Sequence, residues 1–152
     1  MDAEIGMFLA AIDESLEMIA ESLEGLDSES IRWRPVADAN CLALIAKHSF
    51  ANAHRNVLAH FAGQPYDYHR EEEFALDDET VATLSAAFET LRGRMRGRLD
   101  TMPHASLDAS CNHARLGKVP GRAVLLQAAR HAAEHAGEAR LTRQLVLARK
   151  AQ

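Results

Sequence analysis

Residues 120–150 of the chain read PGRAVLLQAARHAAEHAGEARLTRQLVLARK, and this stretch decides the fold. Pro120 suits the first turn of a helix, where its missing N–H leaves no hydrogen bond unmade. Apolar and small residues then recur at steps of three and four positions, and His131 and His135 belong to the same series. The pattern predicts one long helix whose buried face carries two imidazole rings.

The same periodicity predicts three more helices: residues 3–24, residues 40–62 with Asn40 as N-cap, and a third from a cap at Asp77 or Asp78 to Leu99. Four helices of this length favour an all-α fold, an antiparallel up-and-down bundle in which the second and fourth helices run parallel. No strand pattern is visible. The polar segment 66–76, with three consecutive glutamates, is interpreted as a solvated loop.

Length and composition favour a single globular domain over residues 1–152. The apolar share of 47% suffices for a core, and a net charge of −5 argues against a nucleic-acid partner. No basic leader precedes the first helix, and no apolar run approaches the ~18 residues of a membrane span. Two cysteines are too few for a disulfide framework, so we expect a cytoplasmic protein with reduced thiols and no membrane partner.

The spacing of three histidines suggests a metal site in the interior of the bundle. His131 and His135 lie four positions apart, so their rings stack about 6 Å apart on an apolar face, where each polar ring needs a partner. His48 shares a face with Leu44 and Asn52. It lies about 12 Å into the second helix, nearly the depth of His131, about 16 Å into the fourth. Three imidazoles with an open fourth position are typical of catalytic zinc, while nickel, iron or manganese also fit.

The other histidines and the cysteines are not assigned to this site. His54 and His60 rotate away from the face of His48 and are interpreted as surface or interface residues, and three histidines fall in loops: His69, His104 and His113. Cys41 lies near a helix start that could favour a thiolate, although a buried structural cysteine is the more common case. Residues 131–135 match the H-x-x-E-H string of inverted zinc proteases, but only 17 residues follow, too few for their distant acidic ligand.

In three short motifs, the chain resembles the DinB/YfiT-like metalloenzyme family. Residues 40–48, NCLALIAKH, look like the second-helix motif of that family, and the tripeptide 33–35, Trp-Arg-Pro, fits its W-x-P approach to this helix. The string His131-x-x-x-His135-x-Gly137 is similar to the last-helix motif of the same family. One departure is Glu138, which stands where the family often has glutamine.

The resemblance implies a four-helix bundle, often a homodimer, with three metal ligands: His48, His131 and His135. Characterised relatives include thiol-dependent S-transferases and a thiol-dependent isomerase, so it also implies a low-molecular-weight thiol as cofactor. Among the metals that suit three histidines, zinc or nickel is expected. A carboxylate at Glu138 could orient a histidine from outside, add a further ligand, or pair with Arg55.

The leading hypothesis is a metal-dependent enzyme that acts on a small molecule, specifically a thiol S-transferase that uses a metal-activated thiolate. Trp33 and residues 100–119 would form the mouth of the site, while Asn52 and Arg55 would anchor the substrate or form a buried salt bridge. The alternatives are a non-catalytic metal- or ligand-binding stress-response module and a metal-free dimerisation bundle. An open coordination position on a cavity favours the enzyme, and a fourth protein ligand such as Glu138 favours the module.

Overall fold

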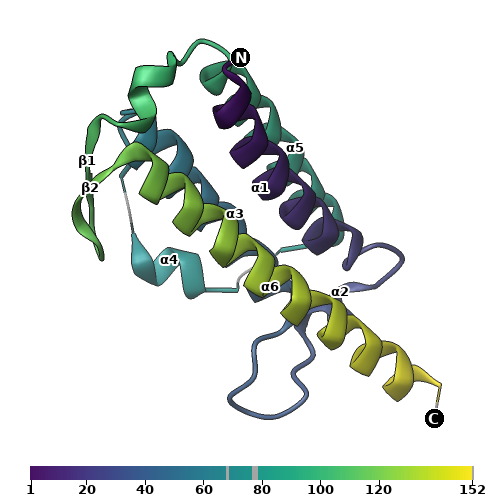
Figure 1. The fold of residues 1–152 in the computed structure, drawn as a ribbon. Coiled ribbons are helices and arrows are strands. Elements are labelled where there is room, and N and C mark those ends of the chain that lie inside the picture. Colours follow the sequence, from purple (N-terminus) through teal and green to yellow (C-terminus); the bar gives the residue numbers. More distant parts are fainter. Residues whose placement is uncertain (68, 77–78, 152) are drawn as a thin grey trace.

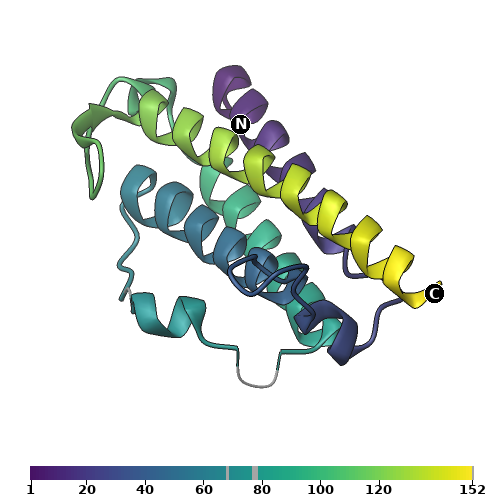
Figure 2. The same ribbon diagram turned by 90° about the horizontal axis from the view of Figure 1, so that it is seen from below.

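The computed structural model describes residues 1–67, 69–76 and 79–151. Four long helices make up the body of the molecule (Figure 1, Figure 2): α1 (Ala3–Glu21), α3 (Leu42–Ala53) with its π-helical continuation η1 (His54–Phe61), α5 (Val81–Leu99) and α6 (Gly121–Lys150). The shorter elements are α2 (Ser28–Arg32), α4 (Arg70–Phe74), the 3₁₀-helix η2 (His104–Leu107), and the antiparallel strands β1 (Ser110–His113) and β2 (Gly117–Pro120). The mostly helical fold expected from the sequence is confirmed.

The directions of the helices differ from the up-and-down order. Helices α1 and α6 run the same way, because Arg122 donates to Glu4 at 2.6 Å near their starts and Arg143 donates to the carbonyl of Ser22 at 2.9 Å near the other end of α1. The chain returns along the bundle between η1 and α5, with α4 on the way, so α5 starts at the same end as α3 (Figure 1). Helices α3 and α6, expected to be parallel, are therefore antiparallel.

The N-terminus of α5 is closed by a capping box. The Thr80 side chain accepts from the backbone N–H of Thr83, and the Thr83 hydroxyl oxygen accepts from the backbone N–H of Thr80. Each exchange satisfies an N–H that the helix itself leaves unpaired. Helix α5 thus begins at Val81, and the predicted caps Asp77 and Asp78 lie outside the described residues.

A tightly packed core joins the four long helices. The largest fully buried side chains come from α1 and the turn after it, α2, α3, η1, α5 and η2: Ile5, Ile12, Leu16, Ile19, Leu23, Ile31, Leu42, Ile45, Leu58, Met95, Leu99 and Leu107. Helix α6 contributes mainly small residues to the core, which lets its backbone approach its neighbours closely. None of the described helices is long and apolar enough to cross a membrane.

A β-hairpin occupies part of the connection that was expected to be a loop. Strands β1 and β2 pair from Ser110 opposite Pro120 to His113 opposite Gly117. Each strand has only four residues, too few to show a clear alternation of apolar and polar residues, and the prediction that the chain lacks strands was therefore wrong. The hairpin places His113 and the residues after it beside η1 and the start of α6 (Figure 2).

Candidate metal centre

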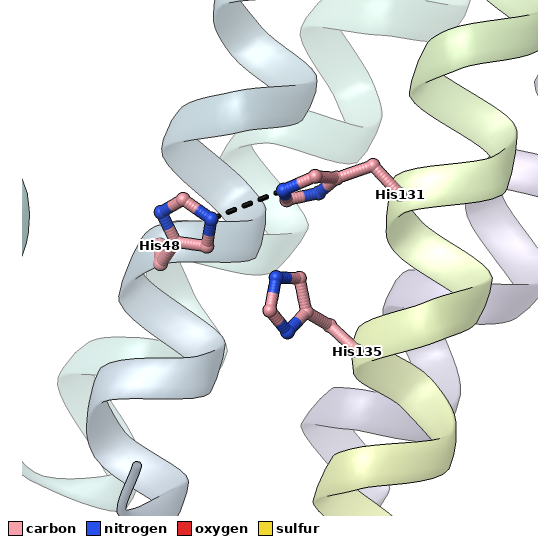
Figure 3. A group of neighbouring side chains, drawn as sticks. All are labelled: His48, His131 and His135. Carbon is pink, nitrogen blue, oxygen red and sulfur yellow. Dashed lines mark hydrogen bonds between the residues drawn. The ribbon is translucent and has the colours of Figure 1, made fainter. Parts of the chain in front are cut away.

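Three imidazole rings converge between α3 and α6 (Figure 3). One ring nitrogen each from His48, His131 and His135 lies within 4.8 Å of the other two, and Nε2 of His48 is 3.1 Å from Nε2 of His131. All three side chains are half-buried. The predicted meeting of these residues occurs, but the depth argument behind it assumed parallel helices. In the antiparallel pair, Asn40 lies opposite Glu138, and His48 faces His131 and His135 for the same reason.

His48 is held from outside the cluster by an acidic residue of α4. Its Nδ1 contacts Oε1 of Glu73, and the other carboxylate oxygen accepts from Arg55 at 3.3 Å. Hydrogen bonding of Nδ1 to a carboxylate leaves Nε2 directed at the other histidines and fixes the ring. The Glu73 side chain is only 3% exposed, so the interpretation of segment 66–76 as a solvated loop was wrong for this residue and for α4, while Glu71 and Glu72 are exposed. One signal was available: Phe74 directly follows the glutamates, and its ring lies 5.1 Å from that of His48.

His135 is held in the same way by Glu138. Its Nδ1 lies 2.7 Å from Oε2 of Glu138, and Oε1 of that carboxylate accepts a hydrogen bond from Asn40 at 2.8 Å. Of the roles considered for Glu138, the structure shows the one of orienting a histidine. The pairing with Arg55 was wrong, because Arg55 lies deeper along α3 and η1 and contacts Glu73 instead.

His131 is kept neutral by its surroundings. Burial, followed by the neighbouring His135 and His48, lowers the pKa of His131 to about 3, so a nitrogen lone pair is available at neutral pH. Two nitrogens that are each ~2.1 Å from a tetrahedral ion lie about 3.4 Å apart, close to the observed 3.1 Å between His48 and His131. Three imidazoles, two of them oriented by carboxylates, fit the donor set of a divalent transition metal.

A cavity of about 520 Å³ opens beside the histidines. His48 and His131 line it, and so do Asn52 and Arg55. The rest of the lining comes from η1, the hairpin and α6, together with one residue after η1: Asn56, Ala59, His60, Tyr66, His113, Ala114, Arg115 and Gln127. Residues 113–115 thus form part of the mouth expected from the connection 100–119. The histidine group can be reached by a small molecule from this side.

Two other positions considered in the sequence lie away from the cavity. Trp33, expected at the mouth, instead has its ring 5.5 Å from the guanidinium of Arg149, near the C-terminal end of α6. The expectation failed because only one of the two loops assigned to the mouth is at the cavity's end of the bundle. Cys41 is fully buried in the apolar core, as a structural cysteine would be.

Two histidines of the π-helix η1 lie against other rings. His60, expected on the surface, lines the cavity with its ring centroid 5.0 Å from that of His113, and the ring centroid of His54 lies 4.4 Å from that of Tyr66. His113, expected in a loop, is buried on β1. A π-helix has more residues per turn than an α-helix, so a face extrapolated at 3.6 residues per turn drifts out of phase.

The fold and the histidine group together define a helical-bundle protein of the DinB-like class. Residues 7–147 match the family model described as mycothiol-S-transferase, and the chain belongs to this family. No curated protein sequence matches the chain significantly.

Three solved structures of low identity share the fold. A conserved protein from Enterococcus faecalis is 19% identical over 97% of this chain and 99% of that one, with a TM-score of 0.77. A DinB-like protein from Bacillus subtilis is 16% identical over 94% and 91%, with a TM-score of 0.65. YfiT from Bacillus subtilis, described as a probable metal-dependent hydrolase with an unusual four-helix bundle topology, is 14% identical over 91% and 87%, with a TM-score of 0.61.

Proposed function

We propose that His48, His131 and His135 bind one divalent metal ion, zinc or nickel, and that the protein is a metal-dependent enzyme that transfers a low-molecular-weight thiol to a small electrophile. One observation carries this proposal: three imidazole nitrogens meet beside a cavity that is lined by two of the rings, those of His48 and His131. Membership of the mycothiol-S-transferase family supports thiol transfer as the reaction, and the description of YfiT as metal-dependent supports the metal.

A bound divalent metal would supply Lewis acidity that lowers the pKa of a thiol, so that thiolate is present at neutral pH. The chain's own residues prepare the site for this chemistry. Glu73 and Glu138 fix the rings of His48 and His135. The low pKa of His131 means that protons do not compete with the metal for its ring nitrogen at neutral pH. The cavity walls hold the reactants away from bulk water, where the thiolate would be better solvated and less reactive.

The arrangement of Glu138 favours an enzyme over a structural or sensing metal site. A site closed by protein needs a fourth ligand, and Glu138 was the candidate. Both of its carboxylate oxygens are engaged, one by Nδ1 of His135 and the other by Asn40. Glu138 is therefore not free to act as the fourth ligand. This supports a reactant, entering from the cavity, rather than a protein side chain in the fourth coordination position.

A transferase assay tests the proposal. Protein stripped with a chelator and then reconstituted with zinc or nickel is mixed with monochlorobimane and a panel of thiols that includes mycothiol, cysteine and 2-mercaptoethanol. We expect conjugation that requires the metal and is lost in His135→Ala. The matched control His104→Ala, which removes an exposed histidine outside the site, should keep full activity. An absence of metal-dependent conjugation across the panel would contradict thiol transfer.

A further inference from the structure

A chain of hydrogen bonds starts at the hairpin and runs into the wall of the cavity. Nδ1 of His113 accepts the backbone N–H groups of Arg115 and Leu116, each at 3.1 Å, so the proton of the neutral ring is on Nε2. Nε2 then donates to Oδ1 of Asn56 at 2.8 Å. Burial, together with nearby positive groups, lowers the pKa of His113, which agrees with a neutral ring in this tautomer.

This series of hydrogen bonds ends at Asn52 and orients the amide of its side chain. Nδ2 of Asn56 donates to Oδ1 of Asn52 at 2.7 Å, so the Asn52 oxygen is committed as an acceptor. Among the described residues, none accepts a hydrogen bond from Nδ2 of Asn52, although the side chain is 7% exposed and lines the cavity. Because Asn52 lines the cavity and its oxygen is already used, this N–H is available to an acceptor bound inside the cavity.

The charges around the cavity are positive. Arg55 and Arg115 both line it, and none of its described lining residues is acidic. Arg55 is fixed by Glu73 outside the lining, whereas Arg115, exposed at the hairpin turn, forms no ion pair with any residue in the described part of the chain. An anionic ligand would be favoured here, and a cationic one disfavoured.

We propose that this cavity is a carboxylate-binding subsite, in which the Asn52 amide and the Arg115 guanidinium donate to a carboxylate carried by one of the two reactants. A planar carboxylate accepts from a guanidinium and an amide at once, and Arg55 adds a fixed neighbouring charge. The proposal rests on the proposed function for its statement that the ligand is a reactant. It narrows the substrate class to small molecules with an anionic carboxylate within reach of the histidine group.

Binding of glutarate tests the subsite without any assumption about the reaction. Titration calorimetry compares glutarate with its neutral analogue glutaramide, on zinc-loaded protein and again after chelation. We expect glutarate to bind more tightly in both states, about tenfold more weakly in Arg115→Gln, and not measurably in Asn52→Asp, which keeps the acceptor oxygen and adds a negative charge. The control Lys118→Gln removes an exposed cation of the same hairpin that does not line the cavity, and should leave binding unchanged.

Two outcomes of this titration would overturn the subsite: equal binding of glutarate and glutaramide, or equal losses in Arg115→Gln and Lys118→Gln. Circular dichroism of each variant confirms that it folds. Because the subsite is read out after chelation too, a protein that binds glutarate but no metal would refute the proposed function and leave the subsite standing. A protein that conjugates thiols but does not bind glutarate would refute the subsite and leave the proposed function standing.

Conjugation rates identify which reactant carries the carboxylate. One arm pairs neutral monochlorobimane with 3-mercaptopropionate or with its methyl ester, and the other pairs neutral 2-mercaptoethanol with iodoacetate or iodoacetamide. Arg115→Gln should lower kcat/KM for the charged member of one arm and leave its neutral partner unchanged. A loss in the first arm assigns the carboxylate to the thiol and a loss in the second assigns it to the electrophile, whereas equal effects on charged and neutral members in both arms would overturn the proposal.

Discussion

Each of two histidines in the cluster is steered by a carboxylate bound to its outer nitrogen. Glu73 reaches His48 from α4, and Glu138 reaches His135 from one turn further along the same helix. The two contacts have the same effect, because a hydrogen bond at Nδ1 fixes the orientation of the ring and makes Nε2 more basic. They differ in how they are built: Glu73 is buried and belongs to a separate short helix, whereas Glu138 is partly exposed.

Replacement of Glu73 tests this steering. Glu73→Gln removes the charge that holds the rings of His48 and Arg55 in place, and we expect metal affinity to fall about 10- to 100-fold. Competition with a chromophoric chelator measures the loss. Glu72→Gln, a neutralisation of an exposed residue in the same helix, should leave the affinity unchanged. Equal affinities of the two variants would mean that Glu73 plays no part in the site.

At the scale of secondary-structure elements, the sequence predicts what depends on periodicity and misses what depends on tertiary contacts. The seams that define α1, α3, α5 and α6 repeat over several turns, so their positions could be predicted. The approach of His48 to the last helix was predicted too, but from a depth argument for parallel helices that the structure contradicts. The hairpin and α4 are too short to show a period, and η1 departs from the α-helical one. Glu73 could not be recognised among three glutamates, because its role depends on where α4 packs.

The junction between β2 and α6 can be tested with two glycines of one helix. A Cβ atom at Gly121 would lie 2.4 Å from the carbonyl oxygen of Ser106 and 2.7 Å from the ring of Phe61, so Gly121→Ala should destabilise the protein by about 1–3 kcal/mol. A Cβ at Gly137 meets nothing within 4 Å, and Gly137→Ala should stabilise by about 0.5–1 kcal/mol. Urea denaturation measures both. Similar effects of the two changes would contradict the close contact at this junction.

At the scale of the whole molecule, the helix directions decide which residues meet. Helix α6 runs antiparallel to α3 and parallel to α1, and its histidine face lies against α3. The sequence did not predict these directions, because a helix of a given amphipathic pattern packs equally well in either sense. They depend on the chain returning along the bundle through α4.

The fold should lose stability as the pH falls below neutrality. Burial lowers the pKa values of His60 and His113, so between pH ~6.5 and the lower native values the unfolded chain binds protons that the folded chain does not. The free energy of unfolding of chelated protein should therefore decrease from pH 7.5 to pH 5, and His113→Gln should reduce that slope. Urea denaturation at several pH values measures it. A free energy of unfolding independent of pH over this range would contradict the burial of these rings as neutral groups.

The most direct test of the central claim is the metal content of protein purified without a nickel column and dialysed against zinc. Inductively coupled plasma mass spectrometry should find about one zinc ion per chain in the wild type and in His104→Ala, and almost none in His131→Ala, whose circular dichroism should be unchanged. A wild type that retains no more zinc than His131→Ala would contradict the claim that the three histidines form a metal site.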